Sequence, residues 1–126
     1  MKGIIWNCKK VKWKYARNEK IFAEKCILLY ICCEQGDGKK QMKETARRII
    51  QLNKKRYLRE TLVIFPYAHL SNHILEQSQA KELIDGLVER LARKNQLKIL
   101  TMGFNQSKEV LIHLLPHNAD VTYFSY

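Results

Sequence analysis

A short apolar segment that ends in a proline constrains the fold more than any other feature of this chain. Residues 62–65 (Leu-Val-Ile-Phe) form an uninterrupted apolar run, which is typical of a strand buried on both faces. Pro66 ends this strand because it has no N–H for a ladder hydrogen bond. Polar-tipped side chains follow at once, namely Tyr67, His69, Ser71, Asn72 and His73. Open α/β sheets bind their ligands in loops that follow buried strands, so this loop is the first candidate site.

The remaining apolar patterns predict one α/β domain over residues 1–126. Residues 25–33 are the most apolar run and predict a central strand, with Gly36 and Gly38 in the turn that follows. Residues 39–56 and 78–95 carry apolar side chains at helical spacing and predict two amphipathic helices. Two strands are expected at residues 3–7 and 11–15, joined by a short turn at Cys8-Lys9-Lys10. Further strands are expected at residues 97–102, 108–115 and 121–126. This order predicts a mixed β-sheet covered by two helices.

The charge balance favours nucleic acid as a partner. The chain has 23 Lys and Arg against 12 Asp and Glu, a formal net charge of +11. The predicted RNA-binding residues are Lys9, Lys10, Lys12, Lys14 and Arg47. The four lysines form a basic edge that either grips phosphates or only discourages edge-to-edge pairing of strands. The predicted helix 78–95 mixes acidic and basic residues, so we expect its outer face to be solvated.

The cysteines and the hydropathy pattern narrow the remaining classes of function. The chain has four cysteines, Cys8, Cys26, Cys32 and Cys33, and none of them is spaced as zinc ribbons require. We therefore expect reduced, buried thiols in a cytoplasmic protein, and no metal site. No run of about 18 apolar residues is present, so nothing indicates secretion or membrane insertion.

Three segments resemble a known family. Residues 65–71 (Phe-Pro-Tyr-Ala-His-Leu-Ser) resemble the Tyr-Pro-Phe-Ala-His-Leu-Ser segment of the archaeal-type threonyl-tRNA synthetase editing domain. Residues 101–106 stand where that family has a Pro-Phe-Gly-(Tyr/Trp)-Tyr-Lys turn, and residues 115–120 where it has His-Pro-Leu-Ala-Glu. The resemblance covers residues 60–120 best. It implies a fold similar to D-aminoacyl-tRNA deacylases, and hydrolysis of serine wrongly attached to threonine tRNA.

The resemblance also implies roles for particular residues. In that family, backbone groups and the 2′-hydroxyl of the substrate carry much of the reaction, assisted by a lysine and a glutamate. The lysine position falls on Gln106, and Lys108 is the predicted catalytic replacement. The glutamate position falls on Ala119 or Asp120; we choose Asp120 because a carboxylate can hold a water or a lysine. The predicted substrate-binding residues are Pro66, Tyr67, Ala68, His69, Gly103, Phe104 and Gln106, and no cofactor is implied.

Two functions follow from the resemblance. The first is a free-standing deacylase that acts in trans on the aminoacylated 3′ end of tRNA, beside a threonyl-tRNA synthetase that lacks its own editing domain. The second is a degenerate module that binds tRNA or a synthetase without hydrolysis, because Gln106 cannot supply positive charge to an oxyanion. A second copy of the chain is a further candidate partner, since deacylases of this fold commonly dimerise. For the enzyme, we expect Lys108 or Gln106, Asp120 and the Ala68-His69 backbone to converge on a pocket for an adenosine ester.

Overall fold

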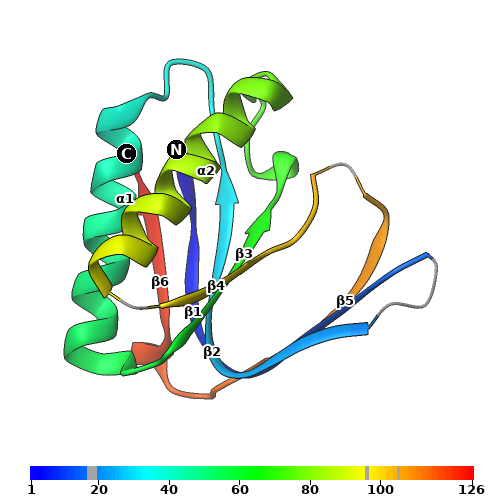
Figure 1. The fold of residues 1–126 in the computed structure, drawn as a ribbon, viewed down its shortest axis with the longest axis vertical. Helices are drawn as coiled ribbons and strands as arrows, with labels where there is room; N and C mark the ends of the chain where they lie inside the picture. The colour runs from blue at the N-terminus through cyan, green and yellow to red at the C-terminus, as the bar shows by residue number, and fades with distance from the viewer. Residues whose placement is uncertain (17–19, 96, 105) are drawn as a thin grey trace.

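The elements of the chain follow one another as a mixed α/β domain (Figure 1). The computed structural model describes residues 1–16, 20–95, 97–104 and 106–126. The helices and strands are β1 (Lys2–Tyr15), β2 (Lys20–Cys32), α1 (Lys39–Leu52), β3 (Thr61–Pro66), α2 (Gln77–Asn95), β4 (Lys98–Thr101), β5 (Lys108–Leu114) and β6 (Val121–Ser125). A π-helical turn (Asn53–Tyr57) follows α1, and two 3₁₀ turns (Ala68–Leu70 and Asn118–Asp120) precede α2 and β6.

The strands form one mixed sheet in the order β4-β3-β2-β1-β5, and β6 also pairs with β1. β3 is parallel to both β2 and β4, whereas the pairs that β1 makes with β2, β5 and β6 are antiparallel. β6 pairs with residues 2–6 of β1 and β5 with residues 8–15, so the two strands follow one another along β1. The predicted mixed sheet with two helices is confirmed.

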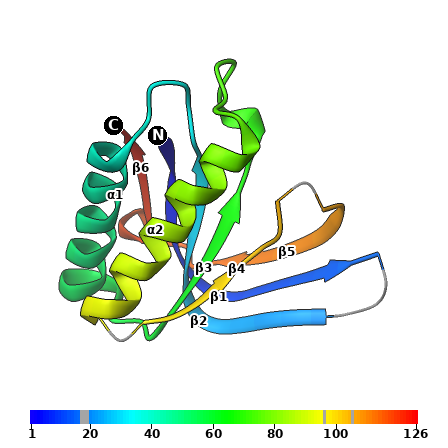
Figure 2. The same cartoon turned by 45° about the horizontal axis from the view of Figure 1, so that its top comes forward.

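The expectation of two separate strands at residues 3–7 and 11–15 is wrong, because β1 is continuous. β2 pairs with it from Lys2↔Cys32 to Lys14↔Lys20, so one partner strand holds both halves. The Lys9-Lys10 region holds an irregularity in the ladder to β5 instead of a turn. Nearby in β2, Lys25 has a positive φ of 47°, a backbone conformation that side chains rarely adopt. Beyond this region the distal halves of β1 and β2 project from the sheet together with β5 (Figure 2).

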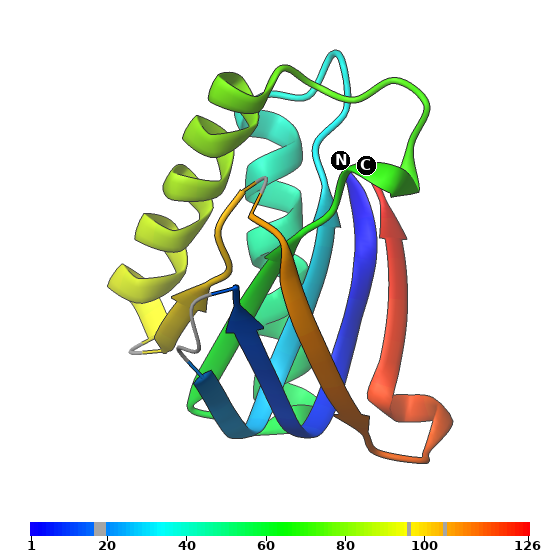
Figure 3. The same ribbon diagram turned by 90° about the vertical axis from the view of Figure 1, so that its right-hand side faces the viewer.

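Two hydrophobic clusters lie on the two faces of the sheet. Both helices cover one face, where Ile64 and Leu62 of β3 pack with apolar residues of α1 and α2 (Figure 3). The projecting strands enclose the second cluster, which includes Val63 of β3 and Trp13 of β1. All three of these β3 side chains are fully buried, as the apolar run predicted. The two clusters therefore pack against both faces of β3 and fix where its carboxyl end lies.

Gly3 provides a test of this arrangement because β1 has no space for a side chain there. A Cβ atom on Gly3 would lie 2.1 Å from the carbonyl oxygen of Tyr30 and 3.0 Å from the ring of Phe124. We expect Gly3→Ala to lower the free energy of unfolding by about 1–3 kcal/mol, measured by chemical denaturation. Gly86→Ala is the control, because its Cβ would meet only Met42 Cε at 3.4 Å. Within a helix that change should raise stability by about 0.5–1 kcal/mol, and equal stability of both variants would contradict the packing of β1.

Candidate active site

A small cavity lies where β3 ends, and it joins two of the segments that the sequence singled out. Its volume is about 150 Å³. Pro66, Tyr67 and Ala68 contribute one wall, and Phe104, from the turn after β4, contributes another. The other lining residues are Ile31, Cys32, Cys33, Ile74, Leu75, Gln77 and Ala80. Segments more than thirty positions apart in the chain thus share one cavity.

Backbone hydrogen bonds at the strand ends position these walls. The Tyr67 N–H donates to the Ile31 carbonyl oxygen at 2.8 Å, which extends the β2–β3 ladder past Pro66. The Met102 N–H donates to the Ile64 carbonyl oxygen at 2.9 Å and holds the start of the Phe104 turn beside β3. The predicted substrate-binding residues Pro66, Tyr67, Ala68 and Phe104 therefore lie together.

The lining residues that sequence analysis missed come from β2 and from the segment 74–80. Ile31, Cys32 and Cys33 belong to the end of the predicted central strand, and the parallel register Ile31↔Pro66 brings them to the cavity. That register depends on long-range pairing, so no local pattern indicated it. Leu75 is tied to the same end of β2, because its N–H donates to the Cys33 carbonyl oxygen at 3.0 Å.

His69 lies outside the residues that line this cavity, in an aromatic cluster beside it. We use this name for Trp6, Tyr30, Phe65, Tyr67 and His69. Within it the rings of Tyr30 and Tyr67 stack at 4.5 Å between centroids, and the His69 imidazole meets the Tyr67 ring at 5.3 Å. The Phe65 ring meets the Tyr30 ring edge-on at 5.1 Å between centroids, and the Trp6 ring lies 5.9 Å from the Tyr30 ring. Ala68 and His69 are exposed, so the aromatic cluster forms one rim of the candidate site.

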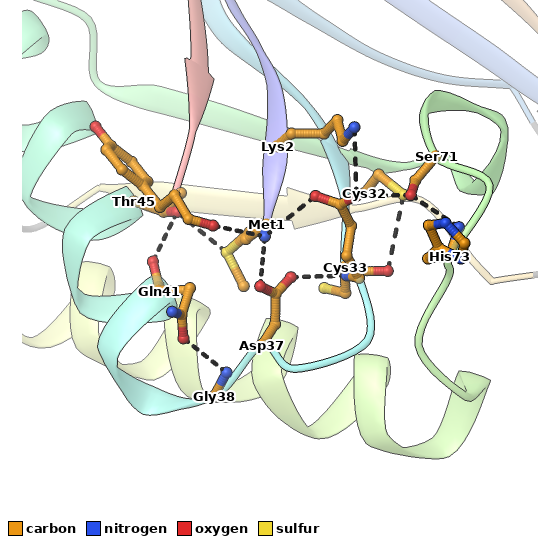
Figure 4. A network of polar contacts seen from close by, with 12 residues as sticks. Met1, Lys2, Cys32, Cys33, Asp37, Gly38, Gln41, Thr45, Ser71 and His73 are labelled. Atoms are coloured by element: carbon orange, nitrogen blue, oxygen red, sulfur yellow. Dashed lines mark hydrogen bonds and ion pairs between the residues drawn. The ribbon is translucent and has the colours of Figure 1, made fainter.

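A polar network fastens the loop after Ala68-His69 to the end of β2 (Figure 4). The Ser71 hydroxyl donates to Glu34 Oε2 at 2.6 Å and accepts from the His73 N–H at 3.0 Å. The Glu34 N–H donates to Asp37 Oδ2 at 2.7 Å, and the Met1 amino group donates to Asp37 Oδ1 at 2.5 Å. This network holds the start of the 71–76 segment, whose Ile74 and Leu75 line the cavity.

Lys108 contacts the turn that carries Phe104, and it is not among the residues that line the cavity at the end of β3. Its Nζ donates to the carbonyl oxygens of Gly103 at 3.1 Å and Gln106 at 2.9 Å. The ammonium also lies 5.5 Å from the centroid of the Phe65 ring. Desolvation by these neighbours lowers the pKa of the Lys108 side chain. Gln106 folds back against Gly103, with its Oε1 only 2.2 Å from where a Cβ on Gly103 would lie.

Asp120 lies at the other end of β5 from Lys108. Its Oδ1 accepts from Asn7 Nδ2 at 2.9 Å, and Asn7 Oδ1 accepts from Arg59 Nε at 2.8 Å. β5 comprises seven residues, and at 3.2–3.4 Å per residue it separates Lys108 from the 3₁₀ turn of Asp120 by roughly 20 Å. The expected convergence of Lys108, Asp120 and Ala68 on one pocket is therefore not found in the described part of the chain. The catalytic roles of Lys108 and Asp120 stay predictions.

The predicted RNA-binding residues lie on two separate surfaces. Lys10, Lys12 and Lys14 occupy the outer side of the projecting strands, because Val11 and Trp13 between them are buried on the inner side. Lys12 stands opposite Phe22 and Leu111, which are 57% and 58% exposed, and Lys10 Nζ lies 5.3 Å from the Phe22 ring. Lys9 is exposed at the ladder irregularity. Arg47 lies on α1, where it pairs with Glu44 at 2.9 Å.

The cysteines are free and buried, as the sequence predicted. Burial raises the pKa of the Cys33 thiol to about 12, and it also raises the pKa of Cys32. Both shifts disfavour the thiolate, which is the nucleophilic form of cysteine. Among the described residues, no three His, Cys, Asp or Glu side chains gather as a metal site requires, and no helix is long and apolar enough to span a membrane.

Comparison with solved structures places this fold beside those of tRNA deacylases. A probable eukaryotic D-amino acid tRNA deacylase matches over 98% of this chain and 97% of its own, with a TM-score of 0.71 and 7% identity. The c-Myc DNA unwinding element binding protein matches over 100% and 99%, with a TM-score of 0.79 and 13% identity. At these identities the likeness concerns the fold alone, and it confirms the predicted D-aminoacyl-tRNA deacylase-like fold.

The sequence identifies the family. Residues 1–119 match the archaea-specific editing domain of threonyl-tRNA synthetase, and the chain belongs to this family. The threonine–tRNA ligase of Staphylothermus marinus is 28% identical over 100 residues, which are 79% of this chain and 16% of the ligase. That of Thermofilum pendens is 30% identical over 71 residues, 55% of this chain and 12% of the ligase. The chain thus spans less than a fifth of the length of these relatives.

Glu34 makes the attachment of the loop sensitive to acid. Partial burial alone would raise the pKa of its carboxyl, but hydrogen bonds from Ser71 and Lys2 and the nearby Met1 ammonium lower it overall. The carboxylate therefore stabilises the fold above the ordinary glutamate pKa of about 4.3, and this is lost as the pH falls through the folded value. At neutral pH we expect Glu34→Gln to cost about 1 kcal/mol in urea unfolding.

Between about pH 5 and 3 the stability of Glu34→Gln should fall less steeply than that of the wild type. Glu82→Gln, at an exposed position of α2, is the matched control for removing one carboxyl. If wild type and Glu34→Gln lose stability in parallel on acidification, Glu34 does not hold the loop through its charge.

Proposed function

We propose that the chain hydrolyses the ester between a tRNA and a wrongly attached amino acid, with serine on threonine tRNA as its substrate. The observation that carries this proposal is the cavity in which Pro66-Tyr67-Ala68 faces Phe104. The chain belongs to the editing-domain family, and by the resemblance described above Pro66-Tyr67-Ala68 matches a segment of that family while Phe104 stands at the position of its turn. We further predict that the chain acts in trans, on tRNA charged by a threonyl-tRNA synthetase that lacks its own editing domain.

The size of the cavity supports a small aminoacyl group as its occupant. Its volume of about 150 Å³ is below the 300–1,000 Å³ of pockets that enclose drug-sized ligands. A seryl group therefore enters, while the terminal adenosine stays at the rim. There the exposed Ala68-His69 turn and the ring of Tyr67 offer contacts, including stacking of the adenine.

The lining of the cavity determines which chemistry is open to the chain. No Lys, Arg, Asp, Glu or His is among the described residues that line it. An aminoacyl ester needs only a positioned water and donors to the oxyanion. In the proposed reaction the water oxygen attacks the ester carbonyl carbon, with the 2′-hydroxyl of the terminal ribose and backbone groups as its assistants. The bond between that carbon and the ribose 3′-oxygen then breaks, and the 3′-oxygen leaves with the proton that the attacking water gives up.

A specific observation favours the second candidate, a module that binds tRNA without hydrolysis. Gln106 stands at the lysine position of the family, and the ammonium of Lys108 is already bound to the carbonyl oxygens of Gly103 and Gln106. Asp120 is separated from both by the length of β5. Loss of an oxyanion donor typically costs about 10²–10³ in rate. Such a module binds tRNA with a steep salt dependence and leaves the ester intact.

A deacylation panel separates these functions. We expect the chain to release serine from Ser-tRNA(Thr) faster than threonine from Thr-tRNA(Thr) or D-amino acids from their tRNAs. Ala68→Leu should slow this release at least tenfold, because the larger side chain fills part of the cavity. Ala92→Leu, at an exposed position of α2, is the matched control. If every charged tRNA survives as long as it does in buffer, the enzyme is excluded and the binding module is retained.

The predicted catalytic side chains need a separate test, because both also have structural contacts. If they are catalytic, Lys108→Ala and Asp120→Ala should each slow serine release by about 10²-fold. Asp120→Asn keeps an oxygen that accepts from Asn7 Nδ2 but removes the charge. A slow Asp120→Asn variant with wild-type thermal stability indicates catalysis by the carboxylate. Wild-type rates in both Asp120 variants would assign Asp120 a structural role only.

A further inference from the structure

A positively charged groove lies between the two helices, on the side away from the sheet. Its volume is about 360 Å³. Figures 1 and 2 show α2 passing across α1, and the groove lies where the amino-terminal half of α1 meets the carboxyl-terminal half of α2. The lining residues are Lys39, Met42 and Lys43 of α1 and Gly86, Glu89, Arg90 and Arg93 of α2. We refer to this site as the interhelical groove.

Four cations face one carboxylate in the interhelical groove. The carboxylate is that of Glu89, which accepts from Arg93 Nη2 at 2.6 Å. Lys39 and Lys43 are exposed, and Arg90 is half-buried. From sequence, the charges of α2 were expected to form an ordinary solvated face. The crossing of the helices instead combines two cations from each into one concave surface, which neither helix pattern indicates alone.

Gly86 keeps the interhelical groove open. Without a side chain at this position, the wall of α2 is bare backbone, and the nearest atom to an added Cβ would be Met42 Cε at 3.4 Å. Met42 is buried and forms an apolar floor. A groove with cationic edges and an apolar floor suits a sugar-phosphate backbone, whose phosphates are charged and whose sugars are less polar.

We propose that the interhelical groove binds the sugar-phosphate backbone of the acceptor arm of tRNA. The inference rests on the proposed function, because α2 connects the groove to the cavity for the 3′ end. Gln77 and Ala80 line that cavity, and at 1.5 Å per residue Gly86 lies about 9 Å and Arg93 about 20 Å further along the helix. This distance spans several nucleotides of RNA, counted back from the 3′ end.

A pair of substitutions at Gly86 tests the interhelical groove without removing any cation. Gly86→Glu adds a carboxylate to the wall of α2, and Gly86→Gln adds a neutral side chain of the same shape. Binding of an uncharged tRNA transcript is measured by fluorescence anisotropy at several KCl concentrations. We expect Gly86→Glu to weaken binding at least tenfold relative to Gly86→Gln. Equal affinities of the two variants would overturn the proposal.

A second pair tests whether position or only net charge matters. Lys43→Gln/Arg90→Gln removes two cations of the groove, and Lys54→Gln/Lys55→Gln removes two exposed cations from the turn after α1. The groove variant should reduce the slope of log K against log salt by about 2, and the turn variant by clearly less. Equal changes would mean non-specific attraction and contradict the assignment. Wild-type tRNA affinity in the groove variant, with loss of heparin binding alone, would contradict RNA as the ligand.

These outcomes are independent of catalysis, because uncharged tRNA carries no ester. If the chain binds the transcript through the interhelical groove but hydrolyses nothing, the deacylase fails and the groove assignment stands. If serine release is intact in Gly86→Glu with unchanged KM, the groove assignment fails and the deacylase stands. When both hold, Gly86→Glu should raise KM for Ser-tRNA(Thr) at least tenfold and leave kcat unchanged.

Discussion

The parallel pairing of β2 with β3 is the interaction on which the candidate site depends. The register runs from Cys26↔Thr61 to Ile31↔Pro66, and the Tyr67 N–H continues it to the Ile31 carbonyl oxygen. One ladder therefore carries three cavity walls: the end of β2, the Pro66-Tyr67-Ala68 segment and, through β4, the turn with Phe104. A shift of one residue would turn each β3 side chain to the opposite face. Burial on both faces of β3 makes such a shift costly.

Because β1 pairs with β6 along its first half and with β5 along its second, Lys108 and Asp120 do not meet at the candidate site. The first half of β1 pairs with β6 and the second half with β5, so the chain must cross the height of the sheet between them. Lys108 begins this passage and Asp120 ends it. The motif positions are close in sequence, but the extended strand between them keeps them apart. The Asp120 carboxylate instead bonds Asn7, in the middle of β1.

Local sequence patterns predicted the elements whose position depends on neighbouring residues, such as apolar runs, helical spacing and proline. The run 62–65 and Pro66 located β3 and its end, and the helical spacing located α1 and α2 within a few residues, apart from the π-helical turn after Leu52. The Lys-Lys pair near residue 9 suggested a turn, and long-range pairing with β2 overrode it. Cys32 and Ala80 came to the cavity through strand register and helix packing. Neither strand register nor helix packing can be read from the pattern of a single sequence.

The residues that line the cavity and the residues that line the interhelical groove differ in charge, so the two sites would contribute differently to hydrolysis. The described walls of the cavity carry no charged side chain, whereas the projecting strands and the interhelical groove each carry several cations. If tRNA phosphates bind these surfaces as proposed, the contacts act equally on the ground state and the transition state of a distant ester, and they change KM without changing kcat. Acceleration of hydrolysis must then come from groups that touch the reacting atoms. In the proposed function those groups are backbone dipoles and the substrate's own hydroxyl, because the described residues that line the cavity include no charged side chain.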